Sequence, residues 1–386
     1  MATRAVSAPT ARPARPARPA RNFRLTVLIL VGLVAGAYLA FGIATAKQTL
    51  GCDFQVYRAA ADRFLAGLPL YDTSISSTGS CNLFYYPPSF VALVVPFALL
   101  GETFGNAAWI AFLVVCYVVG CALLPVRWEV KLAVFLAGAV SWPFIFGVRI
   151  GQVAPILYLL FAVGWRWLER WPAVTGFAVG LGVLVKLQPI VIVGWLVVRR
   201  MWSGLAGVVA AGIVAAGLAV VGLGAWIEMV NVLRNLDNAI TAPTNVSLGA
   251  IAYQHGLPLE AASLLGILGI LAVLALVVVC GLRASTEAGF LVAVVASQVV
   301  SPIIWTHYAL ILLLPVAWLL QRRQWWAALI PVSQAWVLLP FMPIEIYPVG
   351  FYLALLAVPI VDWRERATKR SASRADALAP SPVGPS

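Results

Sequence analysis

The chain alternates long apolar runs with short polar and charged segments over most of its length. Many runs exceed the roughly 18 residues that a helix needs to span the hydrocarbon core of a membrane. The pattern predicts an all-α polytopic membrane protein with about twelve transmembrane helices in the region 25–361. The expected helices lie near 25–44, 106–124, 132–148, 153–168, 172–198 (two short helices), 204–226, 263–281, 287–304, 308–320, 325–342 and 347–361, with a short surface helix at 89–100.

The run 172–198 carries a lysine at its middle and basic residues beyond both ends. Arg170, Arg199 and Arg200 all occupy positions typical of the cytoplasmic side, and a single crossing would separate them. A hairpin of two short helices that turns near Lys186 keeps both ends on one side. Each arm has ~13 residues, about 20 Å, which is too short to cross ~30 Å squarely. Because interrupted backbone is tolerated where it lines a cavity, we expect Lys186 to point into a water-accessible site.

Composition supports a membrane protein: 62% of the residues are hydrophobic and 10% are charged, against roughly 25% charged in soluble domains. The net charge of +12 would suit nucleic acid, but the basic residues gather in the arm 1–24, in short loops and in the tail 362–386. This is the pattern of Lys and Arg kept on the cytoplasmic side, beside anionic lipid. We therefore expect a multi-pass protein of the cell membrane with both termini in the cytoplasm.

Both terminal segments have the Pro-rich or basic composition of disordered chain, so 1–24 and 362–386 are expected to be disordered. The apolar run from Leu25 to Ala44 is followed by a sequence that resembles a signal-peptide cleavage site. An uncleaved first helix is favoured, because the run is longer than the about 7–15 residues of a usual signal peptide.

This topology places two long loops, 45–88 and 228–262, outside the cytoplasm. Asp53 follows the first helix by a few residues, where a carboxylate can accept a proton from a hydroxyl of a lipid-borne substrate. A solvated loop acid is the alternative. Tyr57 and Tyr86 place aromatic rings in the same loop, where they suit either a sugar face or an anchor at the bilayer interface.

The first loop also holds two further acids and two cysteines. Asp62, beside Arg63, and Asp72 fit structural roles better than catalytic ones. Cys52 and Cys81 are able to form a disulfide if the loop lies outside the cytoplasm, or they remain two free thiols.

Other candidates lie near the expected outer surface. Lys186 would suit an anion such as a lipid phosphate, the alternatives being a carboxylate partner or snorkelling. Arg149 is expected at the same level and could share the phosphate, with Gln152 beside it. His307 begins a helix there and is either functional or an interfacial hydrogen-bonding residue. No metal-ligand pattern, P-loop or dinucleotide fingerprint is found in the sequence, so no metal or cofactor is expected.

Five segments in order carry a family resemblance: DFQVYRAAADRFLAGLPLYD, FYYPPSFVALVVPFALL, GQVAPILYLL, VKLQPIVIVGWLVVRRMW and SPIIWTHYALILLLP. Together they resemble polyprenyl-phosphate-mannose-dependent mannosyltransferases, glycosyltransferase family 87 of the GT-C class. The resemblance implies a GT-C fold, a lipid-phosphate sugar donor and a catalytic aspartate that falls on Asp53. It also implies that Lys186 and His307 face the cavity. Family members often have two adjacent histidines where this chain has His307 and Tyr308.

The expected reaction is an inverting transfer of mannose from a polyprenyl-phosphate donor to a hydroxyl of a cell-envelope glycolipid or glycan. Asp53 would act as general base, and Lys186, with Arg149, would hold the departing phosphate. Other donor sugars, arabinofuranose or glucose, stay open. A transporter or lipid flippase is the rival class, although such folds favour charges near the membrane midplane and repeat symmetry; a non-catalytic scaffold is a third possibility.

Overall fold

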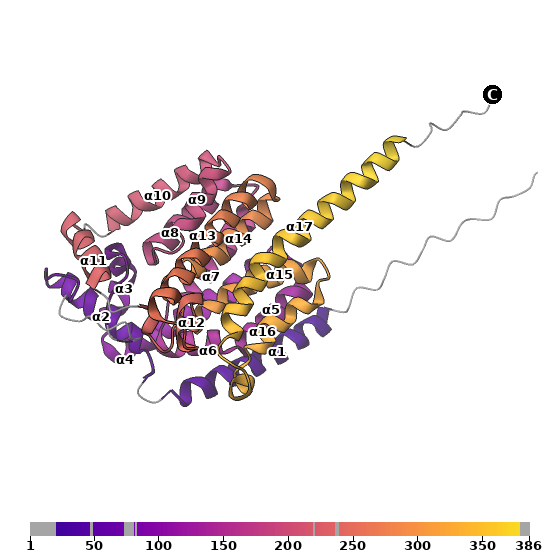
Figure 1. The fold of residues 1–386 in the computed structure, drawn as a ribbon. Helices are drawn as coiled ribbons and strands as arrows, with labels where there is room; N and C mark the ends of the chain where they lie inside the picture. Colours follow the sequence, from indigo (N-terminus) through magenta and orange to yellow (C-terminus); the bar gives the residue numbers. More distant parts are fainter. Residues whose placement is uncertain are drawn as a thin grey trace, which may run out of the picture.

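A computed structural model describes residues 21–46, 49–72, 81, 83–218, 221–235 and 239–378. Within these ranges the chain is helical, and the only extended pairing is an isolated bridge between Ser141 and Ala335. Figure 1 shows the helices packed into one bundle, with α1 along one edge and the end of α17 projecting beyond it. The predicted all-α architecture is therefore confirmed for the described residues.

The elements are, in chain order, α1 (Arg21–Ala44), α2 (Cys52–Leu65), η2 (Pro88–Phe90), α3 (Val91–Ala98), α4 (Glu102–Leu123), α5 (Trp128–Ala139), α6 (Trp142–Ile150), α7 (Ala154–Trp167), α8 (Pro172–Val185), α9 (Ile190–Val198), α10 (Trp202–Leu218), α11 (Leu223–Asn235), η3 (Ala239–Thr241), α12 (Leu248–Gln254), α13 (Leu259–Arg283), α14 (Thr286–Val299), η4 (Thr306–Leu312), α15 (Leu313–Gln321), η5 (Trp325–Ala328), α16 (Leu329–Ser333), η6 (Trp336–Phe341) and α17 (Ile346–Leu378).

Four helices in the described ranges are long and apolar enough to span a membrane: Thr26–Ala44, Glu102–Leu123, Leu259–Arg283 and Ile346–Ser371. The pairs α6–α7 and α10–α11, bent by 120° and 108°, raise this number to six if each pair is one span. The protein is thus a multi-pass membrane protein. Several apolar helices, such as α8 and α14 with 14 residues each, are shorter than a usual span, so the twelve-helix count stays a prediction.

Three expected continuous helices are broken, and these predictions were wrong. The region 132–148 divides into α5 and α6, because Pro143 favours a helix start and the backbone N–H of Trp142 bonds Gln334 instead. The region 204–226 ends as α10 at Leu218, and α11 turns away. The region 325–342 forms η5, α16 and η6, a stretch that contains Pro331 and Pro340.

Two helices extend across the predicted limits of the terminal segments. Helix α1 begins at Arg21, so only residues 1–20 of the expected arm lie outside the described residues. Helix α17 continues to Leu378, through most of the tail that was expected to be disordered from 362. The first residue of this extension is held in the bundle, because Asp362 is buried and accepts the backbone N–H of Ser285 at 3.0 Å. The expected second outer loop, 228–262, contains the rest of α11, η3, α12 and the start of α13.

The hairpin at 172–198 is present as α8 and α9. Close contacts at two glycines show how α8 runs relative to α10. A Cβ added at Gly176 would meet the backbone oxygen of Gly204 at 1.7 Å, and a Cβ added at Gly180 would meet Ala211 at 2.8 Å. Later residues of α8 thus face later residues of α10, so the two helices are parallel and α9 must run back between them. Both ends of the hairpin lie on one side, as the charge pattern required. The close approach of backbones resembles small-residue packing in membranes.

Candidate active site

The turn before α2 brings the first-loop aspartate into the bundle. Gly51 adopts a left-handed φ of 71°, where an added Cβ would also meet the Asn106 side chain at 1.9 Å. Its N–H donates to the Arg149 carbonyl at 2.7 Å, and Asn106 Nδ2 donates to Leu50 O at 3.4 Å. Helix α2 starts directly afterwards, so Asp53 sits in its first turn, where a negative charge is favoured.

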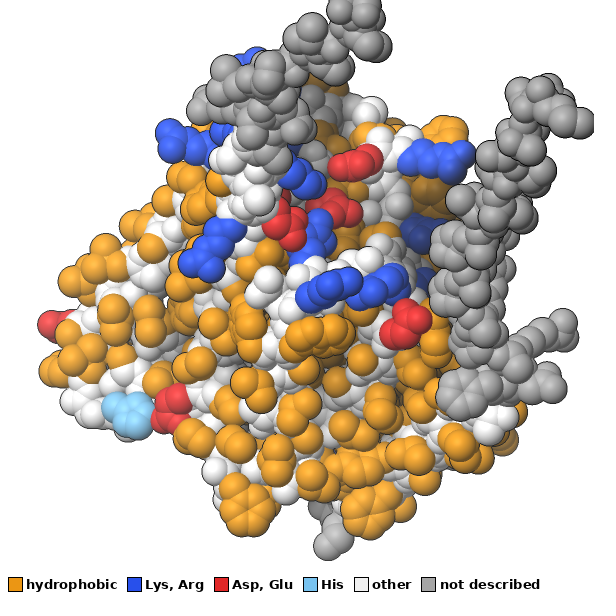
Figure 2. Space-filling view, turned by 90° about the vertical axis from the view of Figure 1, so that its right-hand side faces the viewer, with side chains coloured by type: hydrophobic (Ala, Val, Ile, Leu, Met, Phe, Trp, Pro, Cys, Tyr) orange, Lys and Arg blue, Asp and Glu red, His pale blue; other side chains and the backbone are white. Residues whose placement is uncertain are grey.

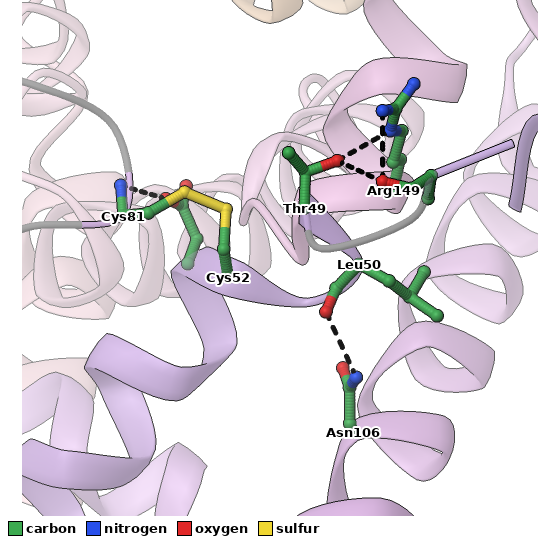
Figure 3. Close-up of a disulfide and its surroundings, with 8 residues drawn as sticks. Thr49, Leu50, Cys52, Cys81, Asn106 and Arg149 are labelled. Carbon is green, nitrogen blue, oxygen red and sulfur yellow. Dashed lines mark hydrogen bonds between the residues drawn. A yellow bond between two sulfur atoms is a disulfide. The ribbon is translucent and has the colours of Figure 1, made fainter.

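Asp53 is only 8% exposed. Its Oδ1 accepts the backbone N–H of Cys81 at 3.1 Å, and Cys81 is joined to Cys52 by a disulfide with Cα atoms 5.1 Å apart (Figure 3). The disulfide therefore holds the Cys81 backbone N–H, a hydrogen-bond donor, beside the Asp53 carboxylate. Burial raises the pKa of Asp53 above its usual range, although the Cys81 N–H, the nearby Lys186 charge and a hydrogen bond from Tyr57 each oppose that rise.

A chain of hydrogen bonds leads to Asp53 from α7. Gln152 Oε1 accepts the backbone N–H of Ala154 at 3.1 Å, which fixes its amide so that Nε2 donates to the Tyr86 hydroxyl at 3.0 Å. The Tyr57 hydroxyl donates to the Tyr86 hydroxyl at 2.8 Å, and hydrogen bonding by Tyr57 also lowers the pKa of Asp53. The Tyr86 hydroxyl therefore accepts from both Gln152 and Tyr57.

The same tyrosines are packed among aromatic rings. Tyr57 contacts Tyr86, Phe90 and Trp109 edge-on, with centroids 4.9, 5.1 and 5.9 Å away. Tyr71 donates to the backbone oxygen of Tyr86 at 2.6 Å. The predicted residues Tyr57, Tyr86 and Gln152 are thus brought together, with their hydroxyls and amide fixed in place.

Lys186 lies at the turn between α8 and α9, in extended backbone (φ −156°, ψ 136°), and is 7% exposed. Its Nζ donates to the Tyr308 hydroxyl and lies 3.9 Å from the centroid of the Tyr308 ring and 5.7 Å from that of Tyr86. The lysine and Asp53 interact electrostatically. None of the ion pairs among the described residues includes either of them.

His307 is 1% exposed, and neither ring nitrogen has a hydrogen-bond partner in the described part of the chain. Its ring lies between those of Phe146 and Tyr308, with centroids 6.0 and 5.0 Å away. Two unused polar atoms in a buried imidazole are costly unless a ligand or water meets them.

Arg149 is held differently from Lys186. Its Nε donates to Thr49 Oγ1 at 2.8 Å and its Nη2 donates to Ala46 O at 3.1 Å (Figure 3). The guanidinium thus anchors the segment between α1 and α2, and the phosphate role predicted for it stays a prediction.

Two polar residues that the sequence did not identify belong to this site. Tyr308 accepts from Lys186 and also hydrogen-bonds the side chain of Gln188. Gln188 Oε1 is buried without a partner among the described residues. The sequence carries only weak signals for these two residues: Gln188 follows Lys186 by two positions, and Tyr308 stands where family members often have a second histidine.

Ligand atoms of Cys52, Asp53 and Cys81 lie within 4.8 Å of one another. A metal would need thiolates from the cysteines, whereas both sulfurs are used in the disulfide. This cluster therefore does not fit a metal site.

Comparison with known proteins identifies the family of this chain. Residues 84–303 match the family model for Glycosyltransferase family 87. The chain is also 30% identical over 342 residues to a protein of Mycolicibacterium smegmatis (strain ATCC 700084 / mc(2)155), in a match that covers 77% of this chain and 76% of the relative. That relative is the polyprenol-phosphate-mannose-dependent alpha-(1-2)-phosphatidylinositol mannoside mannosyltransferase. The chain, a membrane-embedded glycosyltransferase with the GT-C fold that this family implies, belongs to glycosyltransferase family 87.

Proposed function

We propose that the protein transfers mannose from a polyprenyl-phosphate-mannose donor to a hydroxyl of a phosphatidylinositol mannoside or a related envelope glycolipid. The support for both substrates is the relative's name, together with a match over most of both chains. The support for the site is the arrangement of Asp53 and Lys186.

One observation carries the proposal: a carboxylate and an ammonium are buried close together, and neither forms an ion pair with any described residue. Asp53 is bonded by Cys81 and Tyr57, and Lys186 by Tyr308. Burial of a charge without an opposite charge in contact is destabilising. A substrate that carries a hydroxyl for Asp53 and a phosphate for Lys186 would use both charges.

In the proposed reaction, the acceptor oxygen attacks the anomeric carbon as Asp53 takes its proton. The bond between that carbon and the phosphate oxygen breaks, and its electron pair leaves with the lipid phosphate. Attack opposite the leaving group inverts the anomeric centre. Lys186 stabilises the charge that grows on the phosphate. The raised pKa of Asp53 makes it a stronger base than an exposed aspartate.

Two further residues have narrower roles in the proposal. His307 offers to a sugar hydroxyl two ring nitrogens that have no partner among the described residues. Arg149 would reach a phosphate through Nη1 or the second N–H of Nη2, since its Nε and one N–H of Nη2 hold Thr49 and Ala46. In this proposal Arg149 is a second phosphate ligand that also anchors the segment between α1 and α2.

The proposed topology has twelve crossings, with the first loop outside the cytoplasm and both termini inside. A membrane-impermeant maleimide applied to intact cells should label Cys52 or Cys81 only after reduction, because the structure joins them. Labelling that requires cell lysis would show that the first loop lies in the cytoplasm, which contradicts the proposed topology.

Purified protein in nanodiscs, given radiolabelled polyprenyl-phosphate-mannose and a phosphatidylinositol mannoside, should form a mannosylated lipid. Polyprenyl-phosphate donors of arabinofuranose and glucose, supplied in parallel, test the sugar. No covalent product with any donor would contradict transfer and favour a transporter, whereas a product with a different sugar would correct only the donor.

A further inference from the structure

A polar groove lies at the opposite end of the bundle from Asp53. Helix α7 begins at Ala154, beside Gln152 of the active site, and ends near Trp165, whose Nε1 donates to Glu287 at 3.4 Å. Glu287 is in the first turn of α14, directly after α13 ends at Arg283. The end of α13 is therefore separated from the active site by the length of α7, about 21 Å at 1.5 Å per residue.

The groove has a volume of about 630 Å³ and is formed by the ends of two candidate membrane spans, α13 and α17. Arg366 and Arg370 line it from successive turns of α17, and Arg283 lines it from the last turn of α13. Figure 2 shows Lys and Arg side chains gathered toward one end of the molecule, while hydrophobic side chains cover most of the remaining face.

The positive charge of this groove is only partly neutralised. Arg366 Nη2 pairs with Asp362 at 2.9 Å, while its Nε is buried without a hydrogen-bond partner in the described part of the chain. In the same part of the chain, Arg283 and Arg370 make no ion pair. The nearby acids Glu287 and Glu365 are instead held by Arg322, at 3.3 Å each.

Apolar surface continues from the arginines along the bundle. Val279 and Leu282 of α13 are 39% and 66% exposed, and Trp363 of α17 is 37% exposed. These three side chains line the groove together with the arginines. A ligand that fits both parts has an anionic head and an apolar tail.

We propose that this groove binds one anionic phospholipid of the leaflet at this end, with its phosphate on Arg283, Arg366 and Arg370 and an acyl chain along Val279 and Leu282. Basic pockets between membrane helices suit such head groups. The lipid would tie the extended end of α17 to α13. This site is separate from the donor site and does not depend on the proposed transfer reaction.

The test uses the purified full chain in detergent, titrated with phosphatidylglycerol or with phosphatidylcholine of the same acyl chains, and bound lipid is counted by native mass spectrometry. The double variant Arg283→Gln, Arg370→Gln removes the two groove arginines that make no ion pair with any described residue. The control Arg364→Gln, Lys369→Gln removes the same charge from exposed positions of α17 outside the groove.

We expect wild type and the control to hold one phosphatidylglycerol in preference to phosphatidylcholine, and the groove variant to bind it about thirtyfold more weakly. Thermal melting in the same samples should show stabilisation by phosphatidylglycerol only where it binds. Equal loss in both double variants, equal binding of phosphatidylcholine, or displacement of the lipid by millimolar inorganic phosphate would each overturn the proposal.

Discussion

The two ends of the bundle differ in how their charged side chains are buried and paired. At the end that holds Asp53, the carboxylate and Lys186 are buried and make no ion pair with any described residue. At the other end, Arg322 pairs with Glu287 and Glu365, with side chains that are 24–39% exposed. Partly exposed pairs of that kind form at little energetic cost and contribute little. Buried charges without a charged partner are expensive, and their retention at the first end indicates a ligand.

The largest expected effect comes from removal of the buried carboxylate. Asp53→Asn keeps the size of the side chain but cannot accept a proton, so kcat should fall by roughly 10²- to 10⁴-fold, the usual contribution of a general base. The matched control is Asp62→Asn, on the exposed side of the same helix. Expression and donor binding should be unchanged in both. Turnover close to wild type in Asp53→Asn would exclude the proposed base.

Removal of the buried ammonium should affect donor binding. Lys186→Met keeps much of the apolar stem and loses a charge-assisted bond to phosphate, about 1.5–3 kcal/mol or roughly 10- to 150-fold in apparent donor affinity. Lys131→Met is the control, because Lys131 lies near the end of α4 that is remote from Asn106 and Leu50. Apparent affinities for donor and acceptor are measured separately. A change confined to the acceptor would remove Lys186 from the phosphate site.

The sequence predicted the parts of this site that follow from topology. The turn at Lys186 was predictable, because the charge pattern favours a hairpin that keeps Arg170 and the pair Arg199 and Arg200 on one side of the membrane. The helix breaks near Ser141 and Leu218 were not, because no charge marks them within continuous apolar runs. Near Ser141 the break depends on a distant residue, since the backbone N–H of Trp142 bonds Gln334.

The side-chain contacts of the site were less predictable than its members. Gln152 and Tyr86 are 66 positions apart, and Tyr57 and Tyr86 are 29 apart, so their hydrogen bonds exist only in the folded chain. Arg149 shows the converse. Its position near the site was predicted. Its observed bonds to Thr49 and Ala46 join residues about 100 positions apart, so they too exist only in the folded chain.

A smaller effect is expected from the hydrogen-bond chain to Asp53. The Tyr57 bond favours the ionised carboxylate, so it opposes the rise in pKa that burial causes. Because Asp53 must be ionised to act as base, kcat/KM should fall as the pH falls through its raised pKa, at a higher pH than for an exposed aspartate. Tyr57→Phe should raise the pKa further and move this acid limb to higher pH.

The rate at the optimum should also fall in Tyr57→Phe, by roughly 2- to 10-fold for one lost hydrogen bond. The control is Tyr71→Phe, which loses a bond to the Tyr86 backbone but leaves the chain to Asp53 intact. A limb that moves equally in both variants would mean that packing, and not the hydrogen bond, sets the pKa.

The smallest effect is expected at the opposite end. Arg322→Gln breaks both partly exposed ion pairs and the contact of the guanidinium with the Trp318 ring, 3.7 Å from its centroid. Glu287 would still accept from Trp165 and Trp318, so its carboxylate keeps two donors. We expect a loss of about 1 kcal/mol or less in stability, seen as a small drop in melting temperature that shrinks at high salt, with no change in donor affinity or kcat. Donor binding that weakens as much as in Lys186→Met would show that both ends serve the reaction, and the contrast between buried and exposed charge would then not separate function from structure in this protein.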